Sequence, residues 1–203
     1  WNLVPQSIKA YEQGKLSKPV KPICFYIDDA FPAEWKNAIK QGVELWNKAF
    51  EQAGYQKAIE ALDFPKNDRN FDADDIAYSC IRYVPSTSDK VSSSFLANPQ
   101  TGEIINASVF VPANVGNQIY RWLFLGSAAS DASMRTSHLP QDKFNQGLKY
   151  MVACEIGRSL GLLDNIGASY SYPVDSLRNS IFTHTNNLAA SIMANTPFNY
   201  VAQ

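Results

Sequence analysis

The residues best suited to chemistry lie together at positions 154–164, which read CEIGRSLGLLD near the end of a predicted helix. A zinc hydrolase places two histidines four residues apart on one helical face, and uses the glutamate after the first as a general base. A glycine three residues after the second histidine lets the helix end, and a third ligand follows three residues beyond it. This segment keeps Glu155, Gly161 and the spacing.

The three ligand positions of that pattern carry Cys154, Arg158 and Asp164. Arginine cannot bind zinc, because its guanidinium stays protonated and has no lone pair to donate. Cysteine and aspartate are capable ligands, but a catalytic site uses three protein ligands plus water. We therefore predict no metal and no cofactor here, and we interpret Glu155 as an ion-pair partner of Arg158 rather than a surviving general base.

Only two histidines occur, His138 and His184, and both lie outside this segment. We interpret them as ordinary solvated or core side chains. The alternative is a noncanonical metal site that combines them with Cys154, Glu155 or Asp164. We expect no three of these side chains to converge on one ion.

Composition excludes several classes of protein. The 203 residues include 18 Lys+Arg and 19 Asp+Glu, a net charge of −1, so no electrostatic footprint for nucleic acid or polybasic membrane patch is present. Hydrophobic residues make up 45% of the chain, which excludes a disordered protein, and no apolar run is long enough to span a bilayer. The low charged fraction, 18%, favours a secreted surface, and a start at Trp1 favours a fragment of a longer precursor.

Cys24 and Cys80 lie in strand-like segments, and the three cysteines are too few and too widely spaced for a disulfide framework or zinc ribbon. Buried free thiols are the favoured interpretation. A disulfide between neighbouring strands is the alternative.

Hydrophobic periodicity predicts strands over 23–28, 77–84 and 103–111, and long helices over 32–53 and 141–162. The first helix carries an apolar face, with Asp28 or Asp29 as its cap and Gly54 beyond its end. Shorter features are a mobile Ser-rich stretch at 86–94, a strand at 95–97 with a turn at 98–102, a helix at 119–129, an irregular lead-in at 1–21 and a turn-rich tail at 164–203.

The chain resembles the metzincin clan of zinc metallopeptidases, and more closely a family of large, secreted, multidomain bacterial metzincin-like proteins. Besides the helix end, the tripeptide at 191–193 resembles the Met-turn that lies beneath such zinc sites, with Met193 as its methionine. The Asp-Tyr pair that commonly follows this methionine corresponds to Ala194 and Asn195. Matching stretches cover nearly the whole chain: 22–28, 31–32, 42–43, 46, 49–54, 78–83, 99–104, 168–169, 172–178, 191–193 and 198–203.

The resemblance implies an α/β (α+β) fold with a mostly parallel twisted sheet, one antiparallel edge strand, two long helices, and an irregular C-terminal segment with a Met-turn. Residues 1–203 would form one catalytic-type domain, with 164–203 as the remnant of a C-terminal subdomain. Gly161 and Met193 would shape the site, and active relatives would hold zinc. The protein would be secreted, periplasmic or on the cell surface.

Two functions follow from these residues. The first is a catalytically inactive pseudopeptidase that keeps a cleft for a peptide or protein, beside flanking domains of the same chain. The second is an active metal-dependent peptidase with a noncanonical site. In the first, a bidentate Arg158–Asp164 ion pair, extended by Glu155, would replace the metal as the link across the glycine turn.

Overall fold

A five-stranded sheet organises the described part of the protein. The computed structural model describes residues 1–66, 68–128, 131–194, 196, 199 and 201. The strands run in the order β2-β1-β3-β5-β4, and β4 pairs antiparallel to β5 at one edge while the other pairings are parallel. This architecture confirms the expected fold class. The strands are β1 Ile23–Ile27, β2 Ile59–Asp63, β3 Ser79–Val84, β4 Ser92–Ala97 and β5 Ile104–Pro112.

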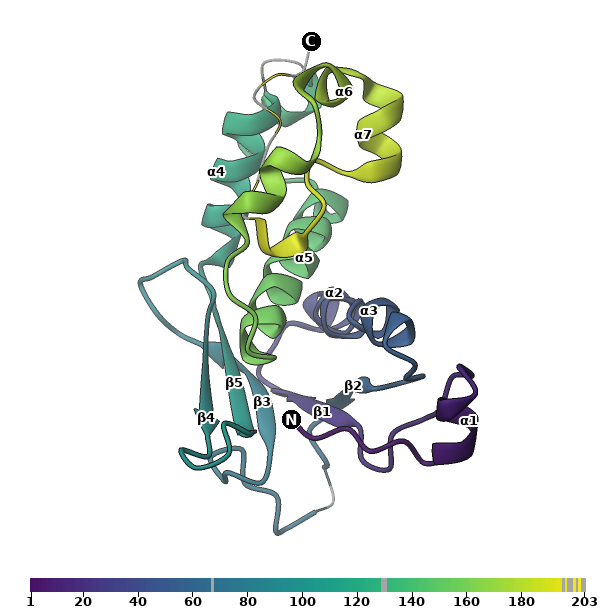
Figure 1. The fold of residues 1–203 in the computed structure, drawn as a ribbon. Helices are drawn as coiled ribbons and strands as arrows, with labels where there is room; N and C mark the ends of the chain where they lie inside the picture. Colours follow the sequence, from purple (N-terminus) through teal and green to yellow (C-terminus); the bar gives the residue numbers. More distant parts are fainter. Residues whose placement is uncertain (67, 129–130, 195, 197–198, 200, 202–203) are drawn as a thin grey trace.

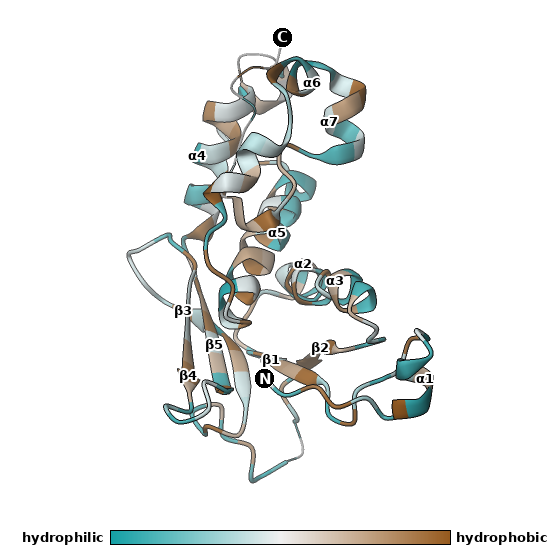
Figure 2. Cartoon of the chain, viewed as in Figure 1, coloured by the Kyte–Doolittle hydropathy of each residue, from teal (hydrophilic) through white to brown (hydrophobic). Residues whose placement is uncertain are grey.

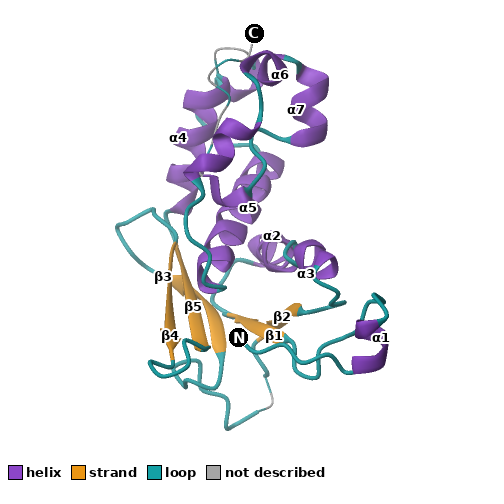
Figure 3. Ribbon diagram, viewed as in Figure 1, coloured by secondary structure: helices purple, strands orange, loops and turns teal. Residues whose placement is uncertain are grey.

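Helices α2, α3 and α5 lie over one side of the sheet (Figure 1; Figure 3). Helix α4 rises from the end of β5 beside α5, while α6 and α7 lie at the end of the molecule farthest from the sheet. The α-helices are α1 Ile8–Glu12, α2 Ala33–Glu44, α3 Asn47–Gln52, α4 Val115–Ser127, α5 Gln141–Ser159, α6 Val174–Arg178 and α7 Ser180–Asn186. The 3₁₀ turns are η1 Ala132–Met134, η2 Ile166–Ser171 and η3 Ile192–Ala194. No helix in the described ranges has both the length and the apolar character needed to cross a membrane.

The core lies between the sheet and helices α2 and α5. Alternate residues of β1 are buried, and apolar residues predominate along the central strands in Figure 2. Burial of this apolar surface is the main term that stabilises the layered arrangement. The fully buried core side chains include Phe25, Ile27, Ile39, Val43, Ile81, Val109, Leu148, Val152 and Ile156.

Glycine allows α2 and α5 to approach closely. A Cβ atom at Gly42 would lie 2.8 Å from the backbone oxygen of Lys149 and 3.0 Å from Val152. The indole nitrogen of Trp46 donates to the backbone oxygen of Ala153 at 2.9 Å, farther along the same helix. These contacts fix α5, which carries the candidate site, against the rest of the core.

The predicted helix over 32–53 divides into α2 and α3. The break lies at Leu45 and Trp46, where the N–H of Trp46 bonds to the carbonyl of Val43 with 3₁₀ spacing. The proposed cap is also wrong, because Pro32 is the N-cap, and Asp28 instead accepts the N–H groups of Ala30 and Tyr83. Gly54 does follow α3, with a φ of 90°.

Other differences concern short elements. The end of the Ser-rich stretch, residues 92–94, forms the start of β4. Helix α4 begins earlier than expected, at Val115, and β2 adds a strand that the sequence pattern did not indicate. The lead-in and the tail contain short helices rather than wholly irregular chain. Short helices contain too few residues for a hydrophobic period of 3.6 to be detected in the sequence.

All three cysteines are free. In the sheet register Cys24 lies beside Glu60, and Cys80 lies beside Tyr26. The interstrand disulfide is therefore wrong, and Cys80 is a buried thiol whose pKa burial raises to about 11.

We predict that Gly42→Ala destabilises the protein, because backbone rather than a movable side chain opposes the new methyl group. Overpacking typically costs about 1–3 kcal/mol, which exceeds the helix-propensity gain of up to about 1 kcal/mol. Gly116→Ala is the matched control, since its Cβ would meet Phe144 only at an ordinary 3.5 Å. Urea denaturation measures both, and equal stability for the two variants would contradict the close contact.

Candidate active site

A glycine turn at the end of α5 brings Asp164 back toward Arg158. Gly161 has a φ of 93°, a conformation that glycine adopts without strain. Its N–H donates to the carbonyl of Arg158, and the N–H of Leu162 donates to the carbonyl of Gly157. This is a Schellman motif, in which the chain reverses after the last helical turn.

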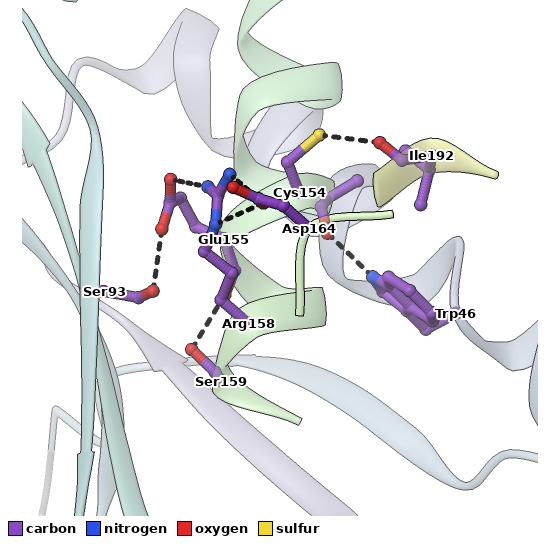
Figure 4. A network of polar contacts seen from close by, with 9 residues as sticks. Trp46, Ser93, Cys154, Glu155, Arg158, Ser159, Asp164 and Ile192 are labelled. Carbon is purple, nitrogen blue, oxygen red and sulfur yellow. Dashed lines mark hydrogen bonds and ion pairs between the residues drawn. The ribbon is translucent and has the colours of Figure 1, made fainter. Parts of the chain in front are cut away.

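Arg158 bonds to two carboxylates at once (Figure 4). Its Nε and Nη2 both donate to Oδ1 of Asp164, at 3.2 and 2.7 Å, and its Nη1 donates to Oε1 of Glu155 at 2.5 Å. The predicted ion pair is therefore present, although both donors meet one oxygen rather than two. The guanidinium links the helix to the segment beyond the glycine turn.

Glu155 is buried, with 7% of its surface exposed. The hydroxyl of Ser93, in β4, donates to its Oε2 at 2.7 Å, so both carboxylate oxygens have a donor. Sequence reasoning missed Ser93. The contact depends on the packing of β4 against α5, and the composition of a serine-rich stretch does not indicate which serine meets Glu155.

The two acids change the protonation behaviour of Arg158. Burial lowers the pKa of the guanidinium, but the hydrogen bonds to Asp164 and the charge of Glu155 outweigh this effect, and the net pKa is raised. Arg158 therefore keeps its positive charge.

Cys154 lies one helical turn before Arg158 and is held as a thiol. Its Sγ donates to the backbone oxygen of Ile192 at 3.5 Å. Burial raises its pKa, and the neighbouring Tyr150 hydroxyl and Arg158 guanidinium lower it by less. A protonated thiol is neither a good nucleophile nor a good metal ligand.

Met193 lies in η3, buried beneath the end of α5. Its backbone oxygen accepts the N–H of Asn165, and a Cβ atom at Gly157 would lie 2.5 Å from its sulfur. The methionine thus joins the last turn of the helix to the segment after the glycine turn. Of the expected Ala194-Asn195 pair, Ala194 is buried in η3, and Asn195 lies outside the described residues.

Two cavities meet at the Arg158–Asp164 pair. One, of about 230 Å³, lies beside Cys154 and Glu155 and reaches α4 through Gln118. The other, of about 460 Å³, is a groove between β4 and the glycine turn, walled by Phe95, Leu162 and Leu163 with Ser93 and Ser94.

His138 and His184 are exposed, and neither lines these cavities. Among the described residues, no group of three or more His, Cys, Asp or Glu side chains is placed to hold a metal ion. The structure brings together Cys154, Glu155, Arg158 and Asp164, and leaves both histidines apart from them.

We predict unequal losses of stability when the ion cluster is broken. Asp164→Ala should cost less than about 1 kcal/mol, because the Asp164 side chain is 48% exposed. Arg158→Ala should cost about 2–3 kcal/mol, because it leaves the buried Glu155 carboxylate with Ser93 alone. Denaturant titration measures both.

Arg178→Ala is a matched control for that measurement, since Arg178 pairs with Asp175 three residues away on an exposed helix. Adding Glu155→Gln to Arg158→Ala should recover part of the loss, because no buried charge then remains. If Arg158→Ala is no worse than Arg178→Ala, the cluster does not stabilise the fold.

Comparison with known proteins supports the family resemblance. The family model described as Met-zincin matches residues 136–203, which include α5, the glycine turn and η3. No curated protein and no solved structure matches the chain significantly. The mostly parallel sheet with its antiparallel edge strand agrees with this family. Residues 136–203 therefore match the Met-zincin family, and this match supports a metzincin-like, metallopeptidase-like domain.

Proposed function

We propose that this metallopeptidase-like domain is a pseudopeptidase, which binds an extended peptide without hydrolysing it. The observation that carries the proposal is the position of Arg158. It occupies the second ligand position of a degenerate zinc motif, and its guanidinium bonds to Glu155 and Asp164. A fixed cation at this point repels a metal ion instead of binding it.

The remaining donors do not suit zinc either. Cys154 and Asp164 are the two capable ligands, one fewer than the three protein ligands of a catalytic zinc site, and Oδ1 of Asp164 already accepts two N–H groups. Glu155 would be a vestigial general base, since Ser93 and Arg158 occupy both of its oxygens. No catalytic step is assigned to a metal in this site.

The groove beside β4 would receive the peptide. β4 is an edge strand of the sheet and carries no charged side chain, so its free edge can pair with an added strand. Leu162 and Leu163 form the opposite wall, and Leu163 is 86% exposed. Gly161 and Met193 would shape this site by setting the path of the chain around it, with Met193 as the methionine of a Met-turn.

The wider setting is part of the same proposal. Residues 1–203 would form one domain with 164–203 as its C-terminal subdomain, working outside the cytoplasm as secreted, periplasmic or surface-bound protein beside flanking domains. The competing function is an active peptidase with a noncanonical metal site. It would require Arg158 to leave the cluster when the metal binds.

Zinc binding separates the two functions. After dialysis against zinc, the purified protein should retain far less than one equivalent by mass spectrometry, and chelators should not lower its Tm. Cys154→His combined with Arg158→His should bind one equivalent, because two imidazoles and Asp164 then form a ligand set. Stoichiometric zinc in the unsubstituted protein would contradict the proposal.

Peptide binding can be measured with a peptide selected on the protein from a randomised decapeptide library. Leu163→Asp should weaken binding about tenfold or more, because it puts a charge in the groove wall without disturbing the core. Ile181→Asp is the matched control, since Ile181 is 78% exposed on α7 and does not line the groove. Failure to select any peptide, or equal effects of both substitutions, would count against a peptide groove.

A further inference from the structure

Four hydrogen-bonded side chains connect the two walls of the groove beside β4 (Figure 4). Asp164, beyond the glycine turn, accepts from Arg158, and Arg158 also donates to Glu155. The other oxygen of Glu155 accepts the hydroxyl of Ser93, which belongs to β4, at 2.7 Å. The polar chain therefore runs from the wall formed by the glycine turn to the wall formed by the edge strand.

The edge strand β4 is otherwise weakly held. It pairs with β5 on one side only, and its register shifts between Leu96 and Ala97. None of its six side chains, all of which lie in the described part of the chain, is buried, and Phe95 and Leu96 are 51% and 49% exposed. An edge strand with so little burial opens locally, and slips in register, more easily than a central strand.

Ser93 links this strand to the interior. In the register of β4 and β5 it lies opposite Val109, a fully buried core residue, and its side chain faces α5. Its acceptor, Glu155, is a carboxylate with 7% of its surface exposed, and hydrogen bonds to charged acceptors are stronger than those between neutral groups. Ser92 and Ser94, on either side, are exposed and point to the opposite face of the sheet.

We propose that Ser93 is a positioning residue of the groove. Through Glu155, it holds β4 at the distance from α5, and in the register, at which an extended peptide can pair with the edge of the strand. Glu155, at the general-base position of the motif, serves as the anchor of this strand. The effect on peptide affinity rests on the proposed function, whereas the anchoring of β4 can be measured without a peptide.

Ser93→Ala tests the anchor by amide hydrogen exchange. The amides of β4 should exchange about tenfold faster because the strand opens more often, while those of the central strands β1 and β3 should be unchanged. Ser92→Ala is the matched control, since it makes the same substitution at an exposed residue that does not line the groove. Ser93→Thr retains the hydroxyl and should retain the protection of β4.

A double substitution shows whether Ser93 acts through Glu155. Once Glu155→Ala has removed the acceptor, adding Ser93→Ala should cause no further acceleration of exchange in β4. Equal exchange rates in Ser93→Ala and Ser92→Ala would overturn the inference. An undiminished effect of Ser93→Ala in the Glu155→Ala background would overturn it as well.

Peptide affinity is the readout that a purely structural contact would leave unchanged. For a selected decapeptide, Ser93→Ala should weaken binding about tenfold, while Ser92→Ala and Ser93→Thr should bind as tightly as the unsubstituted protein. Faster exchange of β4 with unchanged peptide affinity would show that Ser93 does not position the groove.

The same measurements distinguish failure of this inference from failure of the proposed function. If no peptide can be selected although Ser93→Ala frees β4, the peptide-binding function fails and the anchoring of the strand stands. If peptides bind and are weakened by Leu163→Asp, but Ser93→Ala changes neither exchange nor affinity, the inference fails and the peptide-binding function stands.

Discussion

The structure around the site depends on one cation shared by two carboxylates across a helix end. Arg158 projects from the last turn of α5, Glu155 lies one turn earlier, and Asp164 lies beyond the glycine turn. The interaction satisfies a buried carboxylate that would otherwise be costly, and it ties the helix to the segment that follows.

Several uncharged contacts make that geometry available. The Schellman motif at Gly161 turns the chain so that Asp164 faces Arg158, and Met193 packs under Gly157 while its backbone holds Asn165. The indole of Trp46 also holds α5 one turn earlier, through a hydrogen bond to the carbonyl of Ala153. These contacts hold the end of α5 and the segment after the glycine turn around Arg158 and Asp164.

The sequence predicts the features that depend on residues close together in the chain. The strands expected over 23–28, 77–84 and 103–111 are found at 23–27, 79–84 and 104–112. The ion pair follows from the spacing of Arg158 and Asp164 around a glycine. Sequence reasoning could not reach features that arise between distant segments. Ser93 meets Glu155 only because the folded chain sets β4 beside α5. The break in the first long helix lies at Leu45 and Trp46, and hydrophobic periodicity alone does not indicate it.

The central claim is that Arg158 takes the place of a metal ion. Its most direct test is an anomalous difference map at the zinc absorption edge, from crystals equilibrated with excess zinc. The account predicts no peak between Cys154 and Asp164, and a guanidinium that still bonds to Glu155 and Asp164. A peak at coordination distance from Cys154 and Asp164, roughly 2.0–2.3 Å, with Arg158 turned away, would contradict it.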